Sequence, residues 1–182
     1  METLTFNLPY KVKMIENKSI NFSIVLLLKN DENKISRLLS KLENFKNFGG
    51  EVYILDIGST DNTINISREW GCKIEDGTSF SRIIDDEMSN FINDKFDFDK
   101  KENGIVKNGD IYFDYSEAKN YAASRASNKM ILMLENDSNI IDLNIENIIT
   151  HINNGYDTIN PDNKNVSFYN REKFNWTNII FE

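Results

Sequence analysis

Two short apolar segments that stop abruptly at acidic residues constrain the fold of this chain more than any other feature. Residues 53–55 (Tyr-Ile-Leu) run directly into Asp56, and residues 130–134 (Met-Ile-Leu-Met-Leu) lead into a loop that contains Asp137. Continuous apolar runs of this length are typical of strands buried on both faces in a parallel sheet. Because α/β sheets bind ligands just beyond the carboxyl ends of their strands, the two acidic loops together predict a site for a nucleotide and a metal ion.

Strand and helix patterns alternate around these two segments. Each expected strand is a short apolar run, and each expected helix has apolar residues at helical spacing or a helix-breaking glycine at its end. The expected strands are 22–29, 52–56, 72–74 and 130–134, and the expected helices lie near 32–45, 61–70, 116–126 and 142–153. This order predicts an α/β fold with three layers, a mostly parallel central sheet and right-handed crossovers. The two acidic loops are expected at the ends of adjacent strands.

Residues 76–112 interrupt this alternation. The segment is rich in Asp, Asn and Lys, with scattered Phe and Ile. It is expected to be an insertion with a helix near 80–93 and a flexible or hairpin piece near 98–112. Residues 1–21 are expected to form a leader or an edge strand, and the tail from 156 one or two strands. No repeat or linker divides the chain, which predicts a single domain over 1–182.

Composition excludes several classes of function. The net charge is -8 and the sequence pI is about 4.8, which argues against nucleic acid as a partner. One cysteine, Cys72, and one histidine, His151, allow neither an intrachain disulfide nor a zinc site built from Cys and His. No apolar stretch is long enough to span a membrane, and residues 1–21 lack the apolar core of a signal peptide. A cytoplasmic, soluble protein is therefore expected.

The two acidic loops suit the two ends of a sugar nucleotide. A transferase acting on such a donor needs one carboxylate for base or ribose hydroxyls. It needs another to hold a divalent cation that neutralises the departing diphosphate. Asp56 and Asp137 are placed for these two tasks, and Gly58 allows the backbone to turn tightly and approach a ligand.

Three segments resemble the signatures of family 2 glycosyltransferases, which have the GT-A fold. Residues 56–63 (D-I-G-S-T-D-N-T) resemble the family's D-x-G-S-T-D-x-T, and residues 114–122 (D-Y-S-E-A-K-N-Y-A) resemble its D-F-S-x-A-R-N-x-A. Residues 134–138 (L-E-N-D-S) stand where the family has L-D-A-D-E, its metal-binding D-x-D. Residues 168–182 are faintly similar to a later L-F-R … W … H-E segment. The resemblance covers 22–75 and 113–140 well.

The resemblance implies a metal-dependent, inverting transfer of a sugar from a nucleotide-diphospho-sugar, expected to be a UDP-sugar, to an acceptor hydroxyl. Mn²⁺ or Mg²⁺ would be the cofactor, and a glycan, protein or lipid the acceptor; the oligomeric state stays open. Beside Asp56 and Gly58, the implied donor-binding residues are Asp31, Asp114, Lys119 and Glu135. Asp137 and Glu135 are the implied metal ligands, and Glu182 is the candidate catalytic residue of the tail.

Departures from the family pattern keep alternatives open. Glu135 replaces the first aspartate of D-x-D, Ser138 replaces the trailing acid, Lys119 replaces an arginine, and Phe181 replaces a histidine. A minimal enzyme, a fragment of a longer glycosyltransferase and a non-catalytic nucleotide-sugar-binding module all remain open. A nucleotidyltransferase is the weaker alternative, because the chain has no Gly-rich, basic phosphate loop.

Overall fold

The computed structural model describes residues 20–95, 106–134, 144–156, 158–159 and 167–170. A six-stranded sheet with the order β3-β2-β1-β6-β8-β7 forms its centre. β3, β2, β1 and β6 run parallel, whereas β8 pairs antiparallel with both β6 and β7. The strands of this sheet are β1 Phe22–Leu28, β2 Glu51–Asp56, β3 Lys73–Asp76, β6 Met130–Leu134, β7 Thr158–Ile159 and β8 Ser167–Asn170.

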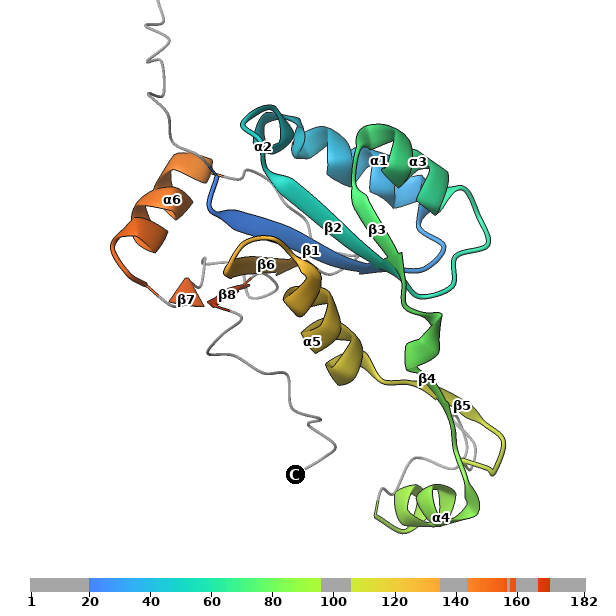
Figure 1. Ribbon diagram of the computed structural model, residues 1–182. Coiled ribbons are helices and arrows are strands. Elements are labelled where there is room, and N and C mark those ends of the chain that lie inside the picture. Colours follow the sequence, from blue (N-terminus) through green and yellow to red (C-terminus); the bar gives the residue numbers. More distant parts are fainter. Residues whose placement is uncertain (1–19, 96–105, 135–143, 157, 160–166, 171–182) are drawn as a thin grey trace, which may run out of the picture.

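Helices cover both faces of the sheet, as Figure 1 shows. Side chains of β1 alternate between two cores: Ile24 and Leu26 pack with α1, α2 and α6, whereas Val25 packs with α5. Ala118 and Ala122 are fully buried and bring α5 close to the sheet. The helices are α1 Glu32–Lys41, α2 Glu43–Asn47, α3 Thr63–Trp70, α4 Asp86–Lys95, α5 Tyr115–Arg125 and α6 Ile145–Asn153. The expected three-layer α/β fold with a mostly parallel sheet is confirmed.

The first expected helix is divided into α1 and α2. The division falls at Leu42, which donates its N–H to the carbonyl of Leu39 at 2.9 Å. The apolar spacing continues across the break because Leu42 and Phe45 are both buried in the same core. Periodicity therefore marked the buried residues correctly but did not reveal the change in backbone direction.

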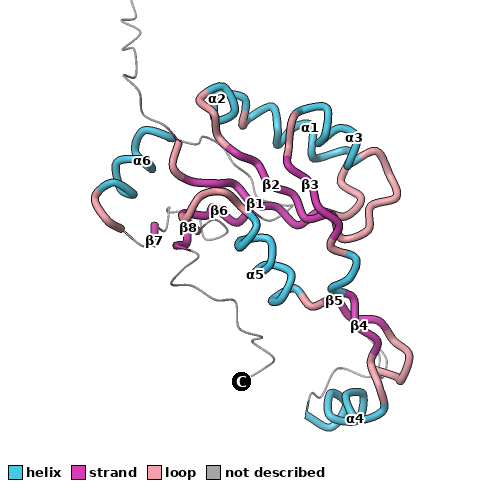
Figure 2. Tube along the Cα trace, viewed as in Figure 1, coloured by secondary structure: helices cyan, strands magenta, loops and turns pink. Residues whose placement is uncertain are grey.

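The described residues of the segment 76–112, which are 77–95 and 106–112, form an arm that projects away from the sheet (Figure 2). The arm consists of a 3-10 turn, η1 Thr78–Phe80, a hairpin of β4 Ser81–Ile83 with β5 Ile111–Phe113, and α4 between them. The helix expected near 80–93 starts later, at Asp86, because the residues before it pair as a strand. Asn93 holds α4 in place: its side-chain amide donates to the carbonyl of Val106 at 2.7 Å and accepts from the N–H of Val106 at 3.0 Å.

The order of the strands corrects one expectation. β1 lies between β2 and β6, so the strands that carry Asp56 and lead to Asp137 are not adjacent. In this central place β1 is covered on both faces, and six of its seven residues are buried. The tail contributes β7 and β8, as expected, whereas residues 1–19 lie outside the described part. Within that part, no helix is long and apolar enough to cross a membrane.

Candidate functional site

Asp56 is the last residue of β2 and opens the loop at the carboxyl edge of the sheet. Its carboxylate is partly buried, and Oδ1 accepts a hydrogen bond from the N–H of Ser59 at 3.0 Å. Ser59 is the one donor to this carboxylate among the residues that the structure describes, which leaves Oδ2 for a ligand. Gly58 has φ +97°, a backbone conformation that favours glycine, so the expected tight turn is present.

The loop after Asp56 rests on the turn between β1 and α1. The side-chain oxygen of Asn30 accepts from the N–H of Thr60 at 2.7 Å, and the N–H of Asn30 donates to Oγ of Ser59 at 3.1 Å. At the start of the same loop, directly after Asp56, the N–H of Ile57 donates to the carbonyl of Leu28 at the end of β1 at 2.9 Å. The two loops therefore behave as one unit, although 30 positions separate Asn30 from Thr60.

A second set of contacts joins the starts of α1 and α3. Asp31 is buried, and its N–H donates to Oγ1 of Thr63 at 2.6 Å. The carboxylate of Asp61 accepts from the N–H of Glu32 at 3.1 Å and from the N–H of Thr63 at 3.0 Å. Desolvation raises the pKa of Asp61, but the hydrogen bonds from Thr63 and Glu32 outweigh it and lower the pKa below its ordinary value. Asp61 thus anchors both helix starts, whereas the N-cap position of α3 is occupied by its neighbour Asn62.

The end of β3 brings a further carboxylate to the same edge. Asp76 pairs in register with Asp56, and its Oδ1 accepts from the N–H of Thr78 at 2.9 Å. Backbone and side-chain hydrogen bonds from Thr78 lower the pKa of Asp76. The N–H of Gly77 donates to the carbonyl of Asp56 at 2.7 Å. Sequence reasoning missed Asp76, although an acid followed by glycine after a short strand repeats the signal that marked Asp56.

Asp114 and Lys119 lie on α5, which covers the opposite face of the sheet from α1. Asp114 caps α5: its Oδ1 accepts from the N–H of Glu117 at 2.9 Å. Its own N–H donates to the carbonyl of Phe80 at 3.0 Å, which ties the start of α5 to the segment that follows β3. Lys119 is partly buried in the second turn of the same helix. The structure therefore groups Asp31, Asp56 and Gly58 in joined loops, whereas Asp114 and Lys119 belong to the start of the helix on the other face of the sheet.

The expected metal ligands Glu135 and Asp137, and the expected catalytic residue Glu182, lie outside the described residues. Within the described part, no group of three or more His, Cys, Asp or Glu side chains could hold a metal ion. Asp56 supplies carboxylate oxygen, the type of ligand that Mg²⁺ and similar hard cations prefer. The described donor set is compatible with such a cation but does not form a complete site for one.

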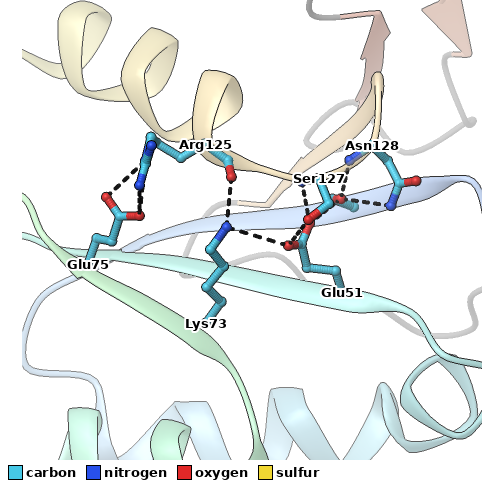
Figure 3. Close-up of polar contacts among 7 residues, drawn as sticks. Glu51, Lys73, Glu75, Arg125, Ser127 and Asn128 are labelled. Atoms are coloured by element: carbon cyan, nitrogen blue, oxygen red, sulfur yellow. Dashed lines mark hydrogen bonds and ion pairs between the residues drawn. The ribbon is translucent and has the colours of Figure 1, made fainter.

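The amino edge of the sheet carries a separate polar network (Figure 3). The carboxylate of Glu51 accepts from the hydroxyl of Ser23 at 2.5 Å and from both the N–H and the hydroxyl of Ser127 at 2.7 Å. Lys73 lies 3.9 Å from Glu51 and donates to the carbonyl of Arg125 at 3.0 Å. Burial raises the pKa of Glu51, but these hydrogen bonds and the charge of Lys73 lower it overall. The charged groups of Glu51 and Lys73 are paired with residues of the protein itself, so we assign this network a role in stability.

Comparisons with known proteins give similarity at the level of structure. No protein-family model matches the chain, and no curated protein matches it. Glucosyl-3-phosphoglycerate synthase from Mycobacterium tuberculosis, solved with Mn²⁺, UDP and glucosyl-3-phosphoglycerate, is 19% identical with a TM-score of 0.40; the match covers 64% of this chain and 33% of that one. Mannosyl-3-phosphoglycerate synthase from Rubrobacter xylanophilus is 14% identical with a TM-score of 0.41, over 65% of this chain and 31% of that one.

A third solved structure, TarS from S. aureus, is 18% identical with a TM-score of 0.49. That match covers 76% of this chain and 34% of the TarS chain. The assignment of the fold rests on the strand order, register and layers described above. This chain is similar to parts of these three proteins and spans about a third of the length of each.

Proposed function

We propose that this chain transfers a sugar from a nucleotide-diphospho-sugar, with a UDP-sugar as the donor, to an acceptor hydroxyl. The observation that carries the proposal is the carboxyl edge of the parallel sheet. There Asp56 stands with one carboxylate oxygen held by Ser59 and the other left for a ligand. Such an edge is where α/β sheets bind nucleotides. The signature resemblance of residues 56–63 and 114–122 assigns the ligand to the nucleotide-sugar class.

The strand order suggests how the donor lies. Asp56 ends β2 and Leu134 ends β6, and both strands pair with β1. Neighbouring strands are about 4.8 Å apart, so about 10 Å separate these two strand ends. A donor held at both would therefore cross the end of β1, beside the turn that leads to Asp31. This arrangement suits a ligand with a base and ribose at one end and a diphosphate at the other, with Asp56 and Asp31 at the nucleoside end.

The remaining expected residues would serve the diphosphate end. Asp137 and Glu135 would hold Mn²⁺ or Mg²⁺, and the cation would neutralise the diphosphate as the sugar–phosphate bond breaks. Lys119 would offset further charge, and Asp114 would act by fixing the start of the helix that carries Lys119. Glu182 is proposed as the carboxylate that accepts the proton of the acceptor hydroxyl. The transfer is proposed to invert the anomeric centre.

Thermal unfolding with nucleotides and nucleotide sugars, with and without Mn²⁺, tests the donor site. A ligand present at 100 times its dissociation constant that binds only the folded state adds about 2.7 kcal/mol of stability, which gives a clear rise in Tm. We expect UDP to raise the Tm of the wild type in a metal-dependent way. Asp56→Asn should weaken UDP binding with or without the metal, whereas Asp137→Asn should abolish only the metal-dependent part of the rise in Tm. A wild type that gains no stability from any nucleotide contradicts the proposal.

A second candidate is a nucleotide-sugar-binding module without catalysis. Glu135 in place of the family's first aspartate and Ser138 in place of its trailing acid favour it. Coupled release of UDP from a donor distinguishes the two candidates. Metal-dependent binding with no UDP release, even with mixed glycan, lipid and peptide acceptors, supports the module. Release that Asp137→Asn abolishes supports the enzyme.

A further inference from the structure

Asn30 is the one non-glycine residue with positive φ among the residues that the structure describes. Its φ is +54°, in the left-handed region, which asparagine tolerates better than most residues. In this conformation its N–H and its side-chain oxygen both reach the loop that follows β2. The N–H donates to Oγ of Ser59 at 3.1 Å, and Oδ1 accepts from the N–H of Thr60 at 2.7 Å and from its hydroxyl at 3.3 Å.

Ser59 connects Asn30 to the carboxylate of Asp56. The N–H of Ser59 donates to Oδ1 of Asp56 at 3.0 Å, so the serine is held by Asn30 on one side and holds the carboxylate on the other. The direction of the second carboxylate oxygen depends on where the first is fixed. A shift of Ser59 therefore turns the whole carboxylate.

The fold itself does not need these contacts. Asn30 is exposed and contributes nothing to either core. The starts of α1 and α3 are already joined by the buried hydrogen bond from Asp31 to Thr63 and by the bond from Glu32 to Asp61. The contacts of Asn30 are directed at the turn next to Asp56 alone.

We infer that Asn30 is a positioning residue for the nucleoside end of the donor: its backbone N–H holds Ser59, its side-chain oxygen holds Thr60, and together these contacts orient the carboxylate of Asp56. This inference rests on the proposed function. Asn30→Gly keeps the left-handed backbone and removes the side-chain acceptor. Asn30→Asp keeps the backbone preference and restores an acceptor oxygen. The pair thus separates the hydrogen bond from the conformation.

Two measurements test the inference. Amide resonances of Ser59 and Thr60 in the free protein should move in Asn30→Gly and return in Asn30→Asp. The dissociation constant for UDP with Mn²⁺ should rise about 3- to 10-fold in Asn30→Gly, as expected for the loss of one hydrogen bond. Ser127→Ala is the matched control, since it removes a hydroxyl hydrogen bond to Glu51 at the other edge of the sheet. It should lower Tm without changing the dissociation constant.

The outcomes separate this inference from the proposed function. Unmoved resonances, unchanged UDP affinity in Asn30→Gly, or equal weakening in Ser127→Ala would each overturn the role of Asn30 while leaving a nucleotide site intact. A wild type that binds no nucleotide refutes the proposed function. In that case the resonances alone decide whether the side chain of Asn30 fixes the loop. Displacement in Asn30→Gly with recovery in Asn30→Asp upholds its positioning of Thr60 and the neighbouring Ser59, and no displacement refutes it.

Discussion

Replacing Gly77 with alanine tests how tightly the carboxyl edge is packed. Gly77 is buried directly after β3, and a β-carbon at this position would lie 2.6 Å from Cγ of Leu55 and 3.0 and 3.1 Å from its two methyl carbons. Non-bonded carbons pack at about 3.5–4.0 Å, so Leu55 or the turn has to move by about 1 Å. Leu55 has no free space to move into, because its side chain is fully buried against α5.

The expected cost of Gly77→Ala follows from this geometry. Gly77 has φ -109°, which alanine adopts without strain, so the cost is one of packing alone. Overpacking of a core by one methyl group costs about 1–3 kcal/mol. Alanine also reduces the conformational entropy of the unfolded chain, which stabilises the folded state by about 0.4–1 kcal/mol. We expect a net loss of about 1–2 kcal/mol, or a fall in Tm of about 2–8 °C for a domain of this size.

A double-mutant cycle in urea makes the test specific to this contact. Leu55→Ala alone should cost about 2–5 kcal/mol, because it leaves a cavity in the core. In the double variant the methyl group at position 77 occupies part of that cavity, so the combined loss should be smaller than the sum by about 1 kcal/mol or more. Strict additivity, or a Gly77→Ala variant as stable as the wild type, would refute the close approach of Gly77 to Leu55.

Three further perturbations follow from individual contacts. Glu51→Gln should lower the free energy of unfolding by about 1–3 kcal/mol at neutral pH. Folding lowers the pKa of Glu51, so the stabilisation by its carboxylate is complete above the ordinary glutamate pKa. It is lost as the pH falls through the pKa of the folded state. Urea unfolding at stepped pH should therefore show the deficit shrinking in acid, and a constant deficit would contradict the charge network. Asp61→Ala should speed amide hydrogen exchange at Glu32, whereas Asp61→Asn should keep most of the protection. Equal exchange rates in the two variants would refute the role of the Asp61 side chain in protecting the start of α1. Asn93→Ala should raise hydrogen exchange at Val106 and leave the global Tm within about 1 °C, whereas loss of the whole domain's stability would show that the arm does not open locally.

The sequence allowed the sheet to be predicted but not the order of its strands. Residues 22–28 and 130–134 were identifiable because strands buried on both faces are apolar without interruption. Periodicity reports which side chains are buried and is silent on which strand lies beside which. The central place of β1 between β2 and β6 is set by the packing of crossovers on both faces. The expected adjacency of the two acidic loops was therefore wrong, although both strands do open on the same edge.

In the candidate site, too, residues with a local sequence signal could be predicted, whereas contacts that depend on tertiary packing could not. Asp56 and Gly58 were identifiable because an acid and a glycine directly after an apolar run indicate a ligand-facing turn. Asn30 was not among the expected site residues, although its side chain contacts Thr60 in the loop that follows Asp56. A hydrogen bond between loops 30 positions apart leaves no periodic or compositional trace in one sequence. Asp76 did carry a local signal, the glycine that follows it, but its register beside Asp56 depends on the pairing of β2 with β3.

The two edges of the sheet are held by different kinds of contact, which allows stability and binding to be perturbed separately. At the amino edge, the carboxylate of Glu51 accepts hydrogen bonds from hydroxyl and amide donors of two segments, and Lys73 adds charge. At the carboxyl edge, the contacts of Asn30 with Ser59 and Thr60 are neutral hydrogen bonds between loops. A change at Glu51 therefore acts on the amino edge without touching the contacts of Asn30. If Asp56 binds the donor, Glu51→Gln should lower the Tm without lowering nucleotide affinity, and a parallel loss of both would show that the edges are coupled.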